Sequence, residues 1–163
     1  TAVFMSGTDF GTQLGLFASP TVYRDLYKPF HKEVNDWIHR HTAWKSMIHT
    51  DGAVKELMED FIEAEFDIFN PIQWTAADMD PRELKQKFGD RICFWGGGVD
   101  TQKTLPFGTP EQVREEVAEH VRIFGQGGGY VFNTVHNVQA QTPVENILAL
   151  YEAVRNCRDY PLG

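Results

Sequence analysis

Polar residues of types common in active sites follow short apolar runs at five places in the chain. The runs end at Asp9, at His49 with Asp51, at Asn70 with Gln73, at Asp100 with Gln102, and at His136 with Asn137. A pattern typical of a helix follows each of them. In parallel sheets built from such units, loops at the carboxyl ends of the strands carry the ligand site. These residues therefore predict one active-site rim.

His49 and Asp51 form the most specific pair, within the run Met47-Ile48-His49-Thr50-Asp51-Gly52. Residues i and i+2 of a strand share a face, so both side chains can point to one position above the strand end. Gly52 permits a tight exit from the strand. An imidazole and a carboxylate in that position suit a divalent metal, or a general base with its orienting partner. The alternative is a hydrogen-bonded pair in which Asp51 caps the next helix.

His136, Asp9 and Asp100 extend the predicted site. If the sheet closes into a barrel, His136 can meet His49 across the mouth, which would give two imidazoles and a carboxylate as metal ligands. Asp9 and Asp100 are predicted to position a substrate. The alternatives are a rim histidine bonded to backbone and aspartates that stabilise their own loops.

Side-chain amides near the same strand ends are predicted to bind substrate: Gln13, Asn70, Gln73, Gln102 and Asn137. The three glycines at 96–98 are interpreted as a place where backbone passes close to a substrate. They are not a phosphate-binding loop, because the Gly-Lys-Ser/Thr element is missing. No Gly-x-Ser-x-Gly element occurs, so covalent catalysis by serine has no support.

The elements that must position these residues alternate along the chain. Strands are expected at 2–6, 44–49, 66–70, 91–96 and 129–135. Helices are expected from Ser19-Pro20 through Ile38, over 54–62, over 81–88, from Thr109-Pro110 to about 125, and over 143–155 with Thr142 as its cap. Asp80-Pro81 is the start signal of the third helix, and Gly89 is its stop.

Other polar residues are assigned to the surface. His31, His39 and His41 are read as surface or packing residues, and His120 as a solvent-facing helical residue. The acidic residues of the same helix, Glu115, Glu116 and Glu119, are read as one solvated face.

Composition narrows the functional class. The formal net charge of −8 argues against nucleic-acid binding, since phosphate contacts need clustered Lys and Arg. No apolar stretch approaches the roughly 20 residues that a membrane span needs, and no signal-peptide pattern opens the chain. Cys93 and Cys157, as two isolated cysteines, predict a reducing compartment, the cytoplasm.

The predicted fold class is α/β, with residues 1–163 as a single domain. Five units are too few for a (β/α)8 barrel, yet open edges of apolar parallel strands are unfavourable in water. We therefore expect the C-terminal five units of a TIM-like barrel, with about three units missing. A start at Thr1 directly before a strand fits a trimmed chain. A self-contained doubly wound domain is the alternative.

An ordered series of motifs resembles the uroporphyrinogen decarboxylase superfamily over essentially the whole chain. The series runs Thr8-Asp9-Phe10-Gly11-Thr12-Gln13, Ser19-Pro20, His49-Thr50-Asp51-Gly52, Asp67-Ile68-Phe69-Asn70-Pro71-Ile72-Gln73, Met79-Asp80-Pro81, Phe88-Gly89-Asp90, Gly97-Gly98-Val99-Asp100-Thr101-Gln102, Gly128-Gly129-Tyr130 through His136, and Pro143-Val144-Glu145-Asn146-Ile147. The resemblance implies a TIM-like barrel and an enzyme.

Two branches of the superfamily are relevant. Zinc-dependent methyltransferases, which move methyl groups between a corrinoid and a thiol such as coenzyme M, carry His-x-Cys where this chain has His49-Thr50-Asp51, and a later cysteine near His136. The resemblance therefore implies metal-assisted methyl transfer, with His49, Asp51 and His136 as ligands of a divalent ion, zinc first, and possible pairing with a corrinoid protein.

True decarboxylases of porphyrin biosynthesis are the second branch. They act on a tetrapyrrole without a cofactor and are usually homodimers, and His136 matches a histidine near the end of their chains. They usually lack a His-x-Asp-Gly element at this strand end. A non-catalytic binding or assembly subunit is the third alternative.

Overall fold

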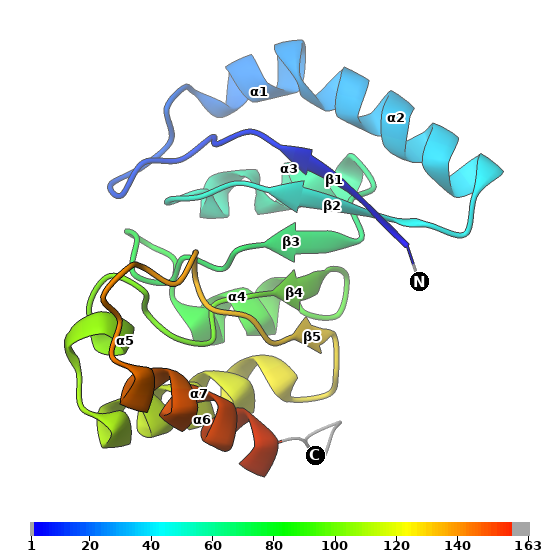
Figure 1. Ribbon diagram of the computed structural model, residues 1–163. Coiled ribbons are helices and arrows are strands. Elements are labelled where there is room, and N and C mark those ends of the chain that lie inside the picture. Colours follow the sequence, from blue (N-terminus) through cyan, green and yellow to red (C-terminus); the bar gives the residue numbers. More distant parts are fainter. Residues whose placement is uncertain (1, 158–163) are drawn as a thin grey trace.

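The computed structural model describes residues 2–157, in which five parallel strands form one sheet (Figure 1). The strands are β1 (Val3–Gly7), β2 (Lys45–His49), β3 (Ile68–Asn70), β4 (Cys93–Trp95) and β5 (Tyr130–Val131). They lie in the order of the sequence, each parallel to the next. The predicted parallel α/β sheet is confirmed. β1 and β5 lie at opposite edges, so closure into an eight-stranded barrel stays a prediction.

The helices flank this sheet. They are α1 (Pro20–Leu26), α2 (Lys28–His41), the 3-10 helix η1 (Lys55–Leu57), α3 (Met58–Glu63), α4 (Pro81–Phe88), α5 (Thr104–Phe107), α6 (Pro110–Gly125) and α7 (Val144–Asn156). In Figure 1, α1 and α2 lie above β1, α3 and α4 lie behind the sheet, and α6 and α7 lie below β5. Within residues 2–157, no helix is both long and apolar enough to cross a membrane.

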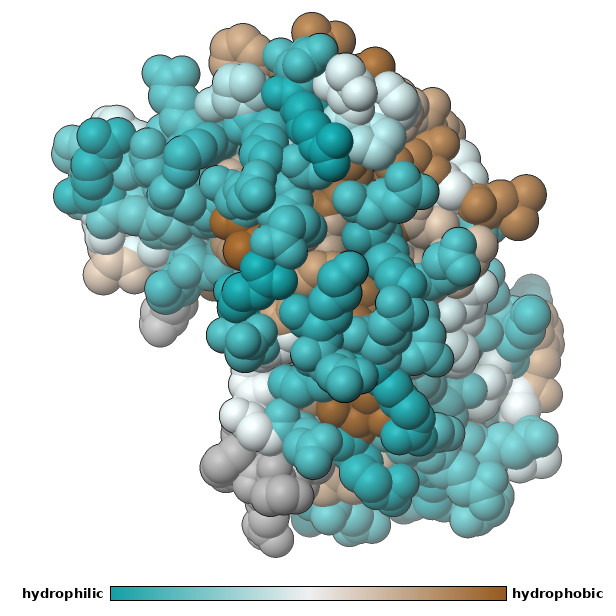
Figure 2. All heavy atoms as spheres, turned by 180° about the vertical axis from the view of Figure 1, so that it is seen from behind, coloured by the Kyte–Doolittle hydropathy of each residue, from teal (hydrophilic) through white to brown (hydrophobic). Residues whose placement is uncertain are grey.

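The core lies between the sheet and the helices behind it. Ile48, Phe69 and Phe94 occupy neighbouring register positions on that face of the sheet and are fully buried. They pack in one cluster with Phe61 and Phe124 from the helices. Each fully buried side chain of this size contributes roughly 1.5–3 kcal/mol. Seen from behind, the molecule is mostly hydrophilic, with apolar side chains along its upper edge, where α1 and α2 lie (Figure 2).

Register places the predicted rim residues at one edge of the sheet. Gly7 is paired with His49, and His49 with Asn70, so the chain leaves β1, β2 and β3 at the same level. Residues that follow these strands therefore gather in one region. This alignment confirms that the carboxyl ends of the strands form a common rim.

The observed elements differ from the expected ones chiefly at three places. The helix expected from Pro20 through Ile38 is two helices that meet at Tyr27, because Pro29 has no N–H to continue the ladder. The strand expected over 129–135 is limited to β5, Tyr130–Val131. A short helix, α5, was not predicted, since its four residues are too few to show a period.

The predicted caps have mixed outcomes. Asp80 accepts a hydrogen bond from the Glu83 N–H and begins α4 as expected, and Gly89 ends it. Ser19 occupies the N-cap position of α1 without a side-chain hydrogen bond. The prediction for Thr142 was wrong, because α7 has Pro143 at its N-cap while the Thr142 hydroxyl donates to the Gln139 carbonyl.

A candidate metal centre at the carboxyl ends of the strands

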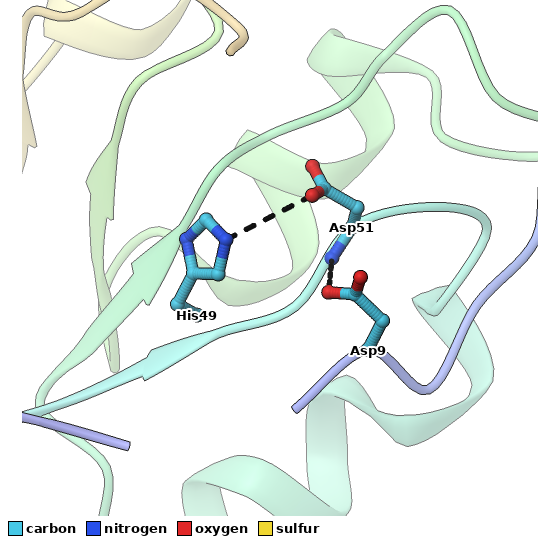
Figure 3. A group of neighbouring side chains, drawn as sticks. All are labelled: Asp9, His49 and Asp51. Atoms are coloured by element: carbon cyan, nitrogen blue, oxygen red, sulfur yellow. Dashed lines mark hydrogen bonds and ion pairs between the residues drawn. The ribbon is translucent and has the colours of Figure 1, made fainter. Parts of the chain in front are cut away.

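Asp9, His49 and Asp51 converge above the ends of β1 and β2 (Figure 3). One ligand atom from each residue lies within 4.8 Å of the other two. The Asp51 N–H donates to Oδ1 of Asp9 at 3.0 Å, and Nε2 of His49 lies 3.8 Å from Oδ2 of Asp51. The first contact joins the loop after β1 to the loop after β2. Two carboxylates and one imidazole therefore face one point.

The other ring nitrogen of His49 is held from behind by Asn70. Nδ1 of His49 lies 2.6 Å from Oδ1 of Asn70, while Nδ2 of Asn70 donates to the Trp95 carbonyl at 2.9 Å. Because the Trp95 carbonyl can only accept, Asn70 turns its oxygen to His49, and Nδ1 of His49 carries the proton. In the neutral ring the lone pair of His49 therefore lies on Nε2, on the side of Asp51. Such an orienting partner is typical of histidines that bind metals.

The turn that carries Asp51 is tightly constrained. Gly52 has a φ of +89°, and a Cβ atom there would lie 2.4 Å from the Gly11 carbonyl carbon. The Gly52 N–H donates to Oε1 of Gln73 at 2.8 Å, and Gln73 is buried. The predicted tight exit at Gly52 is confirmed. Asp51 does not cap the next helix, since η1 begins after Val54.

His136 reaches Asp51 from the other end of the sheet. Its Nε2 lies 3.7 Å from Oδ2 of Asp51, the same oxygen that His49 approaches at 3.8 Å. The segment after β5 therefore extends past the ends of β4 and β3, and within residues 2–157 this contact forms although β1 and β5 are not paired. His136 is the more exposed of the two histidines, with 47% of its side chain accessible against 32% for His49. The three-residue group with mutually close ligand atoms includes Asp9 rather than His136.

The surroundings of Asp51 raise its pKa above the ordinary value. Burial raises the pKa of Asp51, and the nearby Asp9 carboxylate raises it further. His136 and His49 oppose this effect without cancelling it. A cation placed among these groups would relieve the repulsion between the two carboxylates.

A cavity of about 220 Å³ opens beside this cluster. Its lining consists of Gln13, Asp51, Gln73, Thr75, Asp100, Thr101, Gln102, Val135 and His136. A second cavity of about 410 Å³ shares Thr101, Gln102 and His136 with it. Gln13, Gln73 and Gln102 line the first cavity, and their role in binding substrate stays a prediction. Asn137 is exposed and is absent from both described linings, and Asn70 is engaged by His49 and Trp95.

Asp100 lines the cavity but also shapes its own loop. It is 4% exposed, and its Oδ1 accepts hydrogen bonds from the N–H groups of Gln102 at 2.7 Å and Lys103 at 3.3 Å. Both contacts use Oδ1, which leaves Oδ2 of Asp100 for a ligand. A role of Asp100 in positioning substrate stays a prediction.

The glycines at 96–98 make room for the protein itself. Gly96 and Gly97 have φ angles of +101° and +79°. A Cβ at Gly97 would lie 2.9 Å from the Ile72 carbonyl, and one at Gly98 would lie 2.2 Å from the Phe132 ring. Side chains at Gly97 and Gly98 would therefore overlap the chain's own atoms, and a close approach of this backbone to a substrate stays a prediction.

Two residues that had been assigned to the solvated surface lie inside. His120 is 5% exposed and stacks on Trp74 with ring centroids 4.3 Å apart, and burial lowers its pKa. Its position could have been found, since it lies three residues after Val117 and four before Phe124 on the apolar stripe of α6. Glu116 is partly buried and accepts hydrogen bonds from the Asp100 N–H and the Thr104 hydroxyl, both at 2.6 Å. No pattern in the sequence indicated that contact.

The donor set fits a divalent ion. Carboxylate oxygen and imidazole nitrogen are ligands of zinc and of other divalent ions of the first transition row. Asp9 retains its second carboxylate oxygen, and His49 turns Nε2 toward Asp51. Both cysteines of the chain are free thiols, and neither belongs to the cluster.

Comparison with known proteins identifies the chain's relatives. The family profile described as uroporphyrinogen decarboxylase (URO-D) matches residues 10–157. The uroporphyrinogen decarboxylase of Coxiella burnetii is 32% identical over 85 residues, which are 52% of this chain and 22% of that enzyme. The decarboxylase of Psychromonas ingrahamii is 34% identical over 83 residues, 51% of this chain and 22% of that enzyme.

A solved structure resembles the fold. A methyltransferase from Methanosarcina mazei superimposes with a TM-score of 0.73 over 95% of this chain and 42% of its own, at 18% identity. At this identity the likeness concerns the fold alone. The chain spans less than half the length of the solved relative, and its alignments cover less than a quarter of the curated decarboxylases.

Proposed function

The chain belongs to the uroporphyrinogen decarboxylase (URO-D) family, and from this premise we propose that it serves a metal-assisted methyl transfer, from a corrinoid or related donor to a thiol or similar acceptor. The observation that carries the proposal is the cluster of Asp9, His49 and Asp51, whose ligand atoms lie within 4.8 Å of one another. The orientation of His49 that Asn70 imposes supports it, because the neutral ring then directs its lone pair at the carboxylates.

Asp9, His49 and Asp51 would hold the ion, with His136 as a further ligand within reach of Asp51. A bound divalent ion would lower the pKa of a thiol acceptor and so favour its nucleophilic form. The thiol must lose its proton before sulfur accepts a methyl group. Asp51 has two carboxylate oxygens, so one oxygen could hold the ion while the other takes the thiol proton toward solvent. The carbon–sulfur bond would then form as the cobalt–carbon bond of the corrinoid breaks, with the electron pair of that bond left on cobalt.

The cavity beside the cluster would hold the acceptor. Gln73 uses its Oε1 on the Gly52 N–H, which leaves its NH2 group as the donor on the side chain. Gln13 and Gln102 add exposed amides to the same lining. We propose that these groups orient the acceptor, and that Asp100 contributes through its second oxygen.

Metal analysis of the intact protein tests the proposal. We expect the purified wild type to retain about one zinc or similar ion per chain, and His49→Ala to lose it. His41→Ala, which replaces an exposed histidine of α2, is the matched control and should keep the metal. Methyl transfer from methylcob(III)alamin to coenzyme M should follow the metal content. A metal-free wild type with full activity would contradict the proposal.

Uroporphyrinogen decarboxylation is the second candidate, supported by the names of the curated relatives. In that case the same rim would bind carboxylates of the tetrapyrrole, and no metal would be needed. Formation of coproporphyrinogen by the metal-stripped protein separates this candidate from methyl transfer.

A role as a non-catalytic binding or assembly subunit is the third candidate function. A gene product with a native chain mass well above 18.6 kDa, which carries the catalytic parts, would exclude it.

The cytoplasm is the proposed compartment, because Cys93 and Cys157 are unpaired thiols.

A further inference from the structure

Residues 100–104 form a wall between two hollows. On one side lies the rim cavity of about 220 Å³, which Asp100, Thr101 and Gln102 line. On the other side lies a groove of about 810 Å³, whose lining includes Lys103, Thr104 and, from α6, Glu116. The position of this short wall therefore sets the shape of the rim cavity.

One carboxylate from α6 binds both ends of the wall. Oε1 of Glu116 accepts a hydrogen bond from the Asp100 N–H, and Oε2 accepts one from the Thr104 hydroxyl, both at 2.6 Å. Between these points, Asp100 itself accepts hydrogen bonds from the Gln102 and Lys103 N–H groups. Glu116 thus supplies two hydrogen bonds from α6 to a segment whose other described side-chain hydrogen bonds lie within its own turn.

The setting of Glu116 differs from that of its neighbour on the helix. Glu119 is exposed and pairs with Arg82 at 3.0 Å, as an ordinary surface carboxylate does. Glu116 is partly buried, and its two described hydrogen bonds come from uncharged donors. Burial raises the pKa of Glu116. A carboxylate at this place is therefore unfavourable unless its two oxygens accept hydrogen bonds such as these.

We propose that Glu116 is a positioning residue that holds residues 100–104 in place and thereby presents Thr101 and Gln102 to the rim cavity. The inference rests on the proposed function only in taking that cavity as the reaction site. Glu116 acts on the cavity through Asp100 and Thr104, from the far side of the wall.

Hydrogen exchange at individual amides tests the positioning without any substrate. In Glu116→Ala, exchange of the amides of residues 100–104 should accelerate by about tenfold or more, because two hydrogen bonds to a charged acceptor are lost. Glu116→Gln should restore most of the protection, since its carbonyl can accept from Asp100 and its NH2 can donate to the Thr104 hydroxyl. Glu119→Ala, on the same helix, should leave this segment unchanged.

Three outcomes would overturn the inference: unchanged exchange in Glu116→Ala, acceleration spread equally through α6 and the sheet, or no rescue by Glu116→Gln. Zinc binding by these variants should match the wild type, because Asp9, His49 and Asp51 make no described hydrogen bond to residues 100–104. If the wild type binds no zinc, the proposed function is contradicted. The hydrogen-exchange result would still test the role of Glu116, because it does not depend on the metal.

Steady-state kinetics provide a second readout where methyl transfer is observed. Glu116→Ala should raise KM for the acceptor about tenfold, while kcat stays within about twofold, because the metal cluster is intact. A fall in kcat with unchanged KM would contradict a role in positioning the cavity wall.

Discussion

Nδ1 of His49 lies 2.6 Å from Oδ1 of Asn70, and this hydrogen bond decides which ring nitrogen of His49 faces Asp51. Asn70 is itself turned by the Trp95 carbonyl, which accepts from its Nδ2 at 2.9 Å. A chain of two hydrogen bonds across β2, β3 and β4 thus turns Nε2 of His49 toward the rim. The first prediction follows from this chain.

Asn70→Leu should weaken zinc binding about 10- to 100-fold, the usual cost of removing the partner that orients a metal-binding histidine. The variant keeps a side chain of similar size but leaves the His49 ring without its acceptor. Competition with a chromogenic chelator measures the affinity. Asn137→Leu, at an exposed position of the same rim, is the control, and equal affinities in the two variants would count against a role for Asn70.

His136→Ala should weaken zinc binding by about tenfold, less than His49→Ala, because Asp9, His49 and Asp51 already form a compact set without it. The same chelator competition measures both variants. If His136→Ala abolishes binding as completely as His49→Ala does, His136 is an essential ligand and the set predicted from the sequence is the better description.

Gly52→Ala should lower the free energy of unfolding by roughly 3 kcal/mol or more, because the new Cβ would combine a left-handed backbone with overlap on Gly11. Gly127→Ala is the matched control, since Gly127 also has a positive φ, +67°, but no atom lies within 4 Å of its Cβ position. It should cost only about 1 kcal/mol. Denaturant titration measures both, and equal losses would show that the contact with Gly11 is not what constrains the turn.

His120→Phe should alter how stability depends on pH. Burial lowers the pKa of His120, so below about pH 6.5 the unfolded chain takes up a proton at this residue before the folded protein does. The wild type therefore loses stability as pH falls from 6.5 toward the lowered pKa, by about 1.4 kcal/mol per unit of lowering. Phe keeps the stack on Trp74 and does not titrate.

Denaturant titrations between pH 4.5 and 8 check this expectation. The free energy of unfolding of the wild type, relative to that of His120→Phe, should decrease as the pH is lowered. His41→Phe, on the exposed face of α2, controls for replacing a histidine by phenylalanine. If the difference in free energy of unfolding between the wild type and His120→Phe stays constant with pH, the pKa of His120 is not lowered by folding.

Much of the candidate site was predictable because it depends on local rules. An apolar strand that ends in His49-Thr50-Asp51-Gly52 puts two polar side chains on one face, and Gly52 has the positive φ that the tight exit requires. Parallel order brings such ends to one edge of the sheet, as the register of β1 to β3 shows. Asp80 before Pro81 marked the start of α4 for an equally local reason.

Contacts between distant segments were not predictable in the same way. Whether Asp9 or His136 completes the group with His49 and Asp51 depends on how far two loops reach, which no spacing encodes. Asn70 was assigned to substrate, yet the neighbouring strands take both of its polar ends. Glu116 was assigned to solvent from its own helix, because the loop that covers it lies 12 to 16 residues earlier in the chain and the helix period does not indicate where that loop packs.

The sequence by itself determined the alternation of strands and helices, the parallel sheet and the identity of the rim, because apolar periodicity, turn glycines and caps act over a few residues. Only the tertiary structure decided which rim side chains share one point, which nitrogen of His49 is free, and which carboxylate supports the cavity wall. Those outcomes depend on hydrogen bonds between segments 16 to 42 residues apart. Such bonds form only after packing has brought the segments together.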